Sequence, residues 1–192
     1  QARQPHQPLR ILEVGGGTGG TTAWLLPELR GVPALEYHFT DISALFTRRA
    51  QQKFADYEFV HYNELDLEKE AQSQGFQAQS YDLIVAANVI HATRHIGQTL
   101  DNLRPLLKPG GRLLMREITQ PMRLFDFVFG PLVLPLQDIA AREGELFLTT
   151  DQWQQQCRRA GFSKVEWLPQ DGSPTAGMSE HIILATLPGQ AV

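Results

Sequence analysis

The chain has 192 residues, enough for one domain with a full hydrophobic core and too few for two comfortable ones. Its apolar content of 42% and charged content of 20% are close to globular averages, which excludes a disordered chain or a fibre. The formal net charge of -4 offers no basic surface for nucleic acid, which we exclude as a main partner.

No apolar run approaches the roughly eighteen residues needed to span a bilayer, and the start lacks the apolar core of a signal peptide. Cys157 is the only cysteine, so the chain cannot form an internal disulfide. Nothing in the sequence indicates an oxidising compartment. We therefore expect a soluble cytoplasmic protein with no membrane partner and no bound metal.

Residues 1–8 hold two prolines and three glutamines without an apolar period, which predicts a linker and indicates part of a longer protein. Residues 9–192 are expected to form a single domain, in which short apolar strands alternate with helical stretches. The predicted strands of its first part are 9–14, 35–40, 57–62, 81–88 and 111–118, and the predicted helices are 20–30, 43–54, 66–74 and 96–108.

The second part of the chain begins where this alternation stops. Residues 118–147 are rich in Phe, Leu and Pro, and we expect this segment to form a lid over the substrate. For the individual rings of Phe125, Phe127 and Phe129, ordinary core packing is the alternative.

Residues 149–162 predict a capped helix with Thr149 or Thr150 as N-cap and Gly161 at its end. Residues 163–168 and 180–187 predict two final strands whose short connection suits an antiparallel hairpin. The expected fold class is therefore α/β and Rossmann-like, with a seven-stranded, mostly parallel sheet whose last strand is antiparallel.

The stretch ILEVGGGTGGTT, residues 11–22, joins the first predicted strand to the first predicted helix. Glycine permits the positive φ values of a tight turn and lets backbone N–H groups approach a ligand at the helix N-terminus. We expect four glycines to bind a nucleotide-like cofactor: Gly15, Gly16, Gly17 and Gly19. The run also matches the dinucleotide pattern G-x-G-x-x-G, and such turns also occur for purely structural reasons.

Acidic residues beside this turn bear on the choice of cofactor. Glu13 would repel a pyrophosphate but attract an ammonium group, which favours S-adenosylmethionine over NAD. Asp41, at the end of the second strand, can accept both ribose hydroxyls of either cofactor. Asp66 can accept a hydrogen bond from an adenine amine, or can instead cap the predicted helix after it. We place the adjoining Ile42 and Leu67 in the same site.

Three further polar residues lie at the ends of the fourth and fifth strands. Asn88 either lines the cofactor site or forms a turn. His91 follows the fourth strand and Glu117 lies at the end of the fifth, so we expect both at the carboxyl edge of the sheet, where ligands of open α/β folds bind. Imidazole suits proton transfer near neutral pH, and Glu117 would orient it through its other ring N–H. The alternative is a structural histidine and an ordinary acid. The other five histidines are expected to be structural or solvated: His6, His38, His61, His95 and His181.

Five segments of the chain carry a family resemblance: LEVGGGTGGTT, FTDIS, NVIHAT, LLKPGGRLLMREIT and QWQQQCRRAGF. Together they resemble class I S-adenosylmethionine-dependent methyltransferases, and more narrowly the methyltransferase domains embedded in modular polyketide synthases. The resemblance implies that His91 and Glu117 are the catalytic dyad of that family.

The resemblance also implies a substrate and partners. The substrate would be an acyl chain bound through phosphopantetheine to an acyl carrier protein, beside other domains of the same synthase, and the cofactor product would be S-adenosylhomocysteine. The acceptor is either a β-oxygen or the α-carbon of a β-ketoacyl thioester. Carbon-methylating members usually have an N-terminal lid, and this fold starts close to the glycine turn, so we expect O-methylation ahead of C-methylation. The rival functions are an NAD-binding oxidoreductase and an inactive structural domain.

Overall fold

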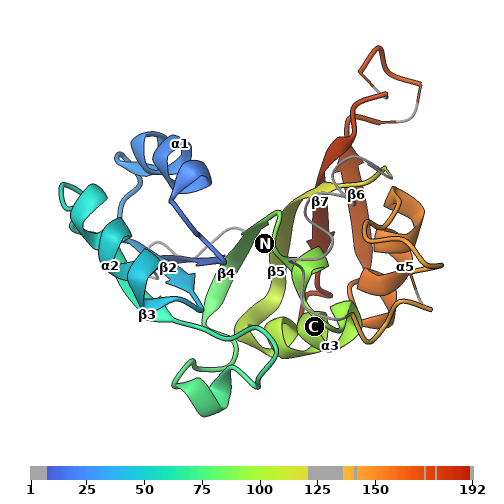
Figure 1. Ribbon diagram of the computed structural model, residues 1–192. Helices are drawn as coiled ribbons and strands as arrows, with labels where there is room; N and C mark the ends of the chain where they lie inside the picture. Colours follow the sequence, from blue (N-terminus) through green and yellow to red (C-terminus); the bar gives the residue numbers. More distant parts are fainter. Residues whose placement is uncertain (1–7, 121–135, 141, 171, 176, 191–192) are drawn as a thin grey trace.

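A seven-stranded sheet is the centre of the computed structural model, which describes residues 8–120, 136–140, 142–170, 172–175 and 177–190 (Figure 1). The order of the strands among these residues is β3-β2-β1-β4-β5-β7-β6. Their bounds are β1 Leu9–Val14, β2 Leu35–Asp41, β3 Val60–Glu64, β4 Tyr81–Ala87, β5 Leu107–Ile118, β6 Lys164–Leu168 and β7 Glu180–Thr186. Strand β7 is antiparallel to both β5 and β6, and the other pairs are parallel. The predicted fold class is confirmed.

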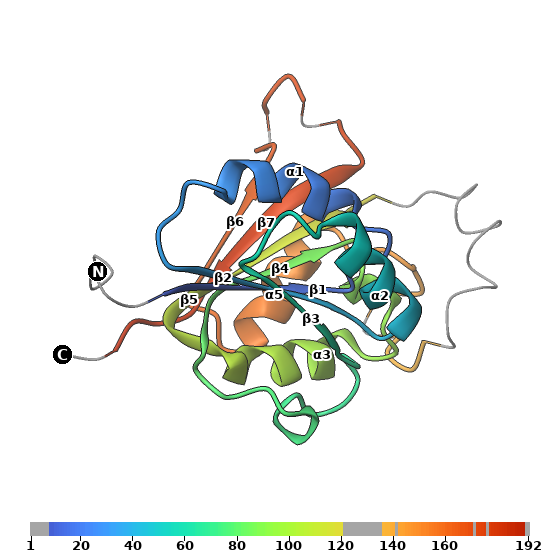
Figure 2. The same cartoon turned by 90° about the vertical axis from the view of Figure 1, so that its left-hand side faces the viewer.

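Helices cover the sheet on two faces. Figure 2 shows α1 (Gly20–Leu29) above the sheet, with α3 (Ile96–Leu103) and α5 (Thr150–Arg159) below it. One apolar cluster joins β1 and β2 to α1 and to α2 (Ala44–Lys53), and a larger one fills the space between β4, β5, β7 and the helices α3 and α5. Because β1 to β5 are parallel, their carboxyl ends lie at one edge of the sheet.

Helix α5 begins and ends as its sequence predicts. Thr149 and Gln152 form a reciprocal capping box, in which each side chain accepts a hydrogen bond from the other residue's backbone N–H. Gly161 follows the helix with a φ of 91°, in the left-handed region that glycine adopts at low cost. Trp153 and Cys157 on its inner face are fully buried.

Two predicted helices differ from the structure. The predicted helix at 66–74 was wrong, because only a 3-10 turn, η1 (Gln72–Gln74), forms there. The side chain of Asp66 accepts the N–H of Glu68 at 3.0 Å, a local bond that competes with helix formation. Helix α3 ends at Leu103 rather than near residue 108, because Pro105 cannot continue it, and β5 starts at Leu107.

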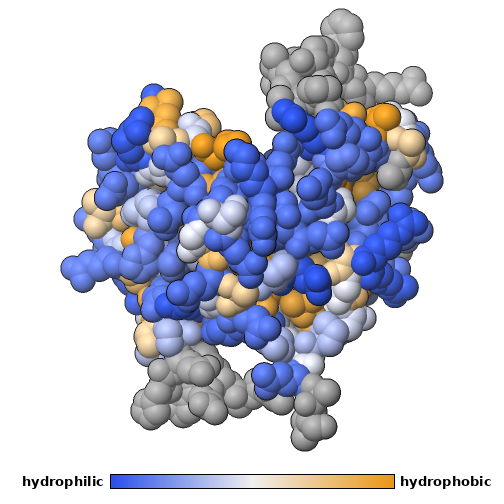
Figure 3. Space-filling view, turned by 90° about the horizontal axis from the view of Figure 1, so that it is seen from below, coloured by the Kyte–Doolittle hydropathy of each residue, from blue (hydrophilic) through white to orange (hydrophobic). Residues whose placement is uncertain are grey.

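Figure 3 shows a face of the molecule that is mostly hydrophilic, with small scattered hydrophobic areas. In the part of the chain that the structure describes, no helix has the length and apolarity that a bilayer crossing requires. Most of the predicted lid, with Phe125, Phe127 and Phe129, lies outside the described residues.

Candidate active site

The strand order reverses beside β1, which has β2 on one side and β4 on the other. In open α/β sheets, ligands bind at the carboxyl ends of the strands at such a reversal. The glycine turn follows β1, Asn88 and His91 follow β4, and Glu117 lies at the end of β5. The fold therefore brings the predicted site residues to one edge.

The glycines of the turn are needed for different reasons. Backbone φ is positive at three of them: 60° at Gly15, 53° at Gly17 and 72° at Gly19. A Cβ on Gly15 would lie 2.3 Å from Val89 Cγ2, and one on Gly16 would lie 2.2 Å from Phe39 Cε2, so both positions exclude a side chain through packing within the protein. A Cβ on Gly17 would meet nothing closer than 4.0 Å. Only Gly17 combines a left-handed turn with open space for a ligand.

Glu13 is buried behind the glycine turn, with 2% of its surface exposed. Its Oε2 accepts hydrogen bonds from Thr22 Oγ1 at 2.7 Å and from the Tyr37 hydroxyl at 2.8 Å. Burial raises the pKa of Glu13 above its usual value, although these two bonds act in the opposite direction. The carboxyl group thus ties β1 to α1 and β2. Its predicted contact with an ammonium group stays a prediction.

Asp41 joins the end of β2 to the glycine turn. Its Oδ2 accepts the N–H of Gly17 at 2.9 Å, and its Oδ1 accepts the N–H of Ser43 at 2.8 Å. Each carboxylate oxygen has a second lone pair, so the group can still accept ribose hydroxyls. Ile42 beside it is 66% exposed and offers an apolar surface at the same edge.

Asp66 and Leu67 lie after β3. Asp66 Oδ2 is 3.0 Å from Lys69 Nζ. Burial acts to raise the pKa of Asp66, but the bonds from Lys69 and from the Glu68 N–H outweigh it and hold the pKa below its usual value. The alternative role of Asp66 as a helix N-cap was wrong, because no α-helix begins directly after this residue. Leu67 is buried within the larger apolar cluster, which leaves its backbone rather than its side chain for any cofactor contact.

Asn88 forms the turn that was one of its two predicted roles, and its contact with the cofactor stays a prediction. Its φ is 51°, a turn conformation that asparagine tolerates, and its N–H donates to the carbonyl of Arg116 at 2.7 Å. Its side-chain Oδ1 is buried and has no hydrogen-bond partner among the described residues. Because an unpaired buried acceptor is costly, this oxygen suits a donor group on a ligand.

His91 and Glu117 form a buried pair. His91 Nδ1 lies 2.5 Å from Glu117 Oε2, while Glu117 Oε1 accepts the N–H of Ile90 at 3.1 Å. Glu117 has no exposed surface and His91 has 6%. A carboxylate at Nδ1 places the ring proton there and leaves Nε2 as an acceptor. No described residue forms a hydrogen bond with Nε2.

Arg142 holds the turn that carries His91, and the sequence offered no sign of it. This side chain is 1% exposed. Its Nη1 donates to the carbonyl of His91 at 2.6 Å and its Nη2 to the carbonyl of Thr93 at 2.7 Å. Its Nε donates to Asp138 Oδ1 at 2.6 Å, which pairs the buried charge. The planar guanidinium thus reaches the carbonyls of His91 and Thr93, a third carbonyl, that of Leu146, at 3.4 Å, and one carboxylate.

The segment around Arg142 also contacts the start of α3 and the ring of His91. Asp138 Oδ2 accepts the N–H of Ile96 at 2.8 Å, at the start of α3. The ring of Phe147 meets that of His91 edge-on, with 5.0 Å between the ring centroids. Described residues of the predicted lid segment, Arg142 and Phe147, therefore contact His91 directly.

The residues present fit an adenosyl amino-acid cofactor. The turn is open at Gly17, Asp41 offers a carboxylate beside it, and the unpaired Asn88 oxygen can take an ammonium hydrogen. Within the described residues, no group of three or more His, Cys, Asp or Glu side chains has metal-binding geometry.

Comparison with known proteins finds methyltransferases. A family model described as "Methyltransferase domain" matches residues 12–113. The highly reducing polyketide synthase pspA of Penicillium soppii is 40% identical over 177 residues, which is 88% of this chain and 7% of that synthase.

Two solved structures resemble the whole fold. The CurJ carbon methyltransferase superposes with a TM-score of 0.88 at 42% identity, over 97% of this chain and 50% of that one. The trans-methyltransferase CalH in complex with SAH superposes with a TM-score of 0.81 at 37% identity, over 94% of this chain and 51% of that one. The present chain thus spans about half the length of these structures and a small part of the synthase.

Proposed function

This chain belongs to the methyltransferase-domain family, and from that premise we propose that it methylates the α-carbon of a β-ketoacyl thioester. The observation that carries the proposal is the buried contact between His91 and Glu117 at the carboxyl edge of the sheet. It supplies a base whose tautomer is fixed.

Membership in the family confirms the predicted class of enzyme and its cofactor, S-adenosylmethionine. It also removes the NAD-binding oxidoreductase as a rival. When bound, the cofactor supplies an electrophilic methyl group on a sulfonium. The protein must hold the acceptor in line with that group and remove a proton from it.

His91 is the proposed base. The α-hydrogen of a β-ketoacyl thioester lies between two carbonyl groups, so the carbon is unusually acidic. His91 Nε2 takes the proton, and the electron pair of the broken C–H bond becomes the new bond from the α-carbon to the methyl group. The sulfur keeps the electron pair of its broken bond to that methyl group. Glu117 at Nδ1 stabilises the imidazolium that forms.

Carbon is a better acceptor than oxygen on two grounds, which reverses our preference from sequence. The solved relative at 42% identity is named a carbon methyltransferase. In addition, proton transfer to imidazole is most efficient from an acid whose pKa is close to its own, and an α-carbon between two carbonyls is far more acidic than a β-hydroxyl.

The proposed partners of this chain are inferred from its relatives among the polyketide synthases. We propose that the acyl group arrives on the phosphopantetheine arm of an acyl carrier protein, and that the chain works beside other domains of a polyketide synthase in the cytoplasm. The polyketide synthase pspA, which aligns with 88% of the present chain, supports this proposal.

Arg142 and Asp138 are proposed as positioning residues. Because the guanidinium donates to the carbonyl of His91 itself, movement of Arg142 would move the base. Asp138 keeps that guanidinium in place and also binds the start of α3. Neither side chain needs to touch the substrate.

The deciding experiment offers the full-length protein carrier-bound β-ketoacyl and β-hydroxyacyl substrates with a methyl-labelled cofactor. Fragment mass spectra then locate the label. We expect it on the α-carbon of the β-ketoacyl substrate. Label on the β-oxygen would restore the earlier preference, and no label on either substrate would reject the proposed substrate class.

A further inference from the structure

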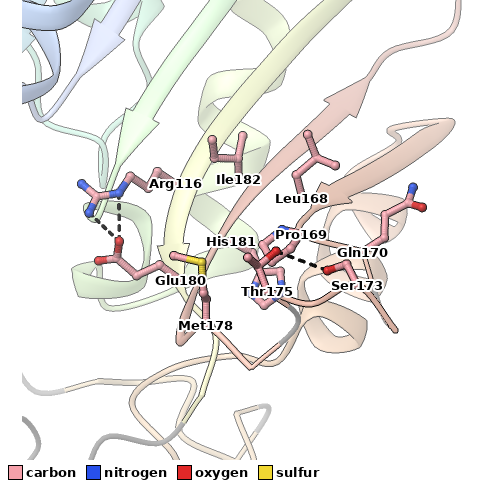
Figure 4. A pocket seen from close by; sticks show the side chains of 10 residues that line it. All are labelled: Arg116, Leu168, Pro169, Gln170, Ser173, Thr175, Met178, Glu180, His181 and Ile182. Carbon is pink, nitrogen blue, oxygen red and sulfur yellow. Dashed lines mark hydrogen bonds and ion pairs between the residues drawn. The ribbon is translucent and has the colours of Figure 1, made fainter.

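A pocket of about 640 Å³ lies where β5, β6 and β7 meet the connection after β6 (Figure 4). Three of its side chains are large, apolar and strongly exposed: Leu168 at 61%, Met178 at 53% and Ile182 at 47%. Exposed apolar groups gathered in one hollow mark binding sites, and the volume is within the range of small-molecule pockets. The mechanism described above makes no use of this pocket.

Among the described residues that line the pocket, no formal charge is left unpaired. Arg116 and Glu180 form an ion pair across one wall, with Arg116 Nε 3.0 Å from Glu180 Oε2. Ser173 and Thr175 on the opposite side bond to each other through their hydroxyls. A charged ligand would therefore break existing pairs, whereas an uncharged chain would leave them intact.

The pocket lies at the same edge of the sheet as the dyad. Arg116 in its wall directly precedes Glu117, and its carbonyl accepts the N–H of Asn88. His181, also in its wall, is the cross-strand partner of Glu117 in the β5–β7 ladder. Facing residues of an antiparallel pair lie about 5 Å apart, so the backbone of His181 is a direct neighbour of Glu117 at this edge.

The pocket also opens on the face that carries α1. Successive residues of a strand point to opposite faces, so Arg116 and Ile182 point away from the buried Glu117 and His181. Helices α3 and α5 fill the face of Glu117. To reach the hollow from the dyad, the acyl chain must therefore pass around the ends of β5 and β7.

We propose that this pocket binds the part of the substrate's acyl chain that extends beyond the β-carbon, away from the thioester. The inference rests on the proposed function, because it takes the reacting carbon to be at His91. It assigns Leu168, Met178 and Ile182 as residues that set the preferred chain length. Each methylene that enters should raise kcat/KM about fourfold, until the pocket is full.

The test fills the pocket with a larger side chain. Ile182→Trp in the full-length protein is compared with the native protein on acetoacetyl and β-ketodecanoyl thioesters. We expect the ratio of kcat/KM for the long substrate to that for the short one to fall on the order of tenfold. Leu184→Trp, on the same face of β7 but outside the pocket, is the matched control and should leave the ratio unchanged.

Each outcome of this test has a distinct meaning. If the native protein methylates both substrates and Ile182→Trp weakens both equally, the acyl chain does not enter the pocket and this inference is rejected. A second variant, Met178→Ala, guards against a tryptophan that merely unfolds the protein, and it should shift the preference toward longer chains. If the native protein methylates neither substrate, the proposed function fails and not only the pocket.

Discussion

His91 Nδ1 and Glu117 Oε2 lie 2.5 Å apart, although 26 positions separate the residues in the chain. They meet because β4 and β5 are parallel neighbours whose carboxyl ends share an edge. Since the second carboxylate oxygen is held by the N–H of Ile90, the acid cannot turn away from the imidazole. The imidazole of His91 is therefore oriented by contacts within the protein.

We predict that His91→Ala abolishes methyl transfer while leaving the affinity for S-adenosylmethionine nearly intact, because the base acts on the substrate. The loss in kcat should be on the order of 10² to 10⁴. Calorimetric titration with S-adenosylhomocysteine measures the affinity. Equal losses of affinity and turnover would mean that His91 binds the cofactor instead.

Glu117→Gln should lower kcat by a similar factor for a different reason. The amide can donate a hydrogen to Nδ1, which moves the ring proton to Nε2 and removes the acceptor. The shape of the side chain and its bond to the N–H of Ile90 are conserved. Unchanged turnover in a folded Glu117→Gln protein would contradict the assigned tautomer.

Arg142→Lys tests whether Arg142 positions His91. Lysine keeps the charge beside Asp138 but cannot donate to the carbonyls of His91 and Thr93 at once, so kcat should fall about tenfold with an unchanged KM for the cofactor. Arg142→Met leaves the carboxylate of Asp138 unpaired in a buried place, and should cost about 3 to 5 kcal/mol of unfolding free energy. If Arg142→Lys alters stability but leaves kcat unchanged, the residue has a structural role only.

Glu13→Gln should separate stability from cofactor binding. Because burial raises the folded-state pKa of Glu13, its contribution to stability is fully present below the unfolded value of 4.5 and decreases as pH rises through the folded value. The variant lacks this titration, so its unfolding free energy should fall less than that of the native protein between pH 4.5 and neutrality. Urea unfolding at several pH values measures this.

The same variant should bind S-adenosylmethionine more weakly, since an amide does not attract the ammonium group as a carboxylate does. Binding of equal strength in the native and Glu13→Gln proteins would assign Glu13 to the internal bonds with Thr22 and Tyr37 alone.

Gly16→Ala should destabilise the fold by about 1 to 3 kcal/mol, because the new Cβ would overlap the ring of Phe39. Adding Phe39→Leu should restore part of that loss. Gly20→Ala, where nothing lies within 4 Å of the added carbon, is the matched control and should not destabilise the protein. Thermal unfolding of the native protein, the two single variants and the double variant Gly16→Ala/Phe39→Leu measures these differences in stability. Equal effects of Gly16→Ala and Gly20→Ala would contradict the packing role of Gly16.

Cys157 should report on unfolding. It has no exposed surface, and burial raises the pKa of its thiol to about 12. Because the thiolate is the reactive form, iodoacetamide at pH 8 should modify this residue only after the chain unfolds in urea. Rapid modification of the native protein would show that α5 opens readily.

The sequence alone determined the features that depend on neighbouring residues and on the periodicity of apolar residues. Alternating strands and helices predicted the sheet, and Thr149 and Gly161 predicted the ends of α5. The positions of His91 and Glu117 at the carboxyl ends of adjacent strands predicted that they meet. The helix expected at 66–74 failed because side-chain bonds around Asp66 compete with the helical backbone, and periodicity does not reveal such bonds.

Only the tertiary structure decided which groups support the site. Arg142 acts through backbone carbonyls, which every residue possesses, so no sequence motif marks its partners. Gly15 and Gly16 are explained by Val89 and Phe39, which come from other strand ends. The pocket beside β7 likewise exists because strands distant in the chain leave apolar side chains exposed together. Contacts of this kind depend on the distances between packed segments, and a linear pattern of residues does not contain those distances.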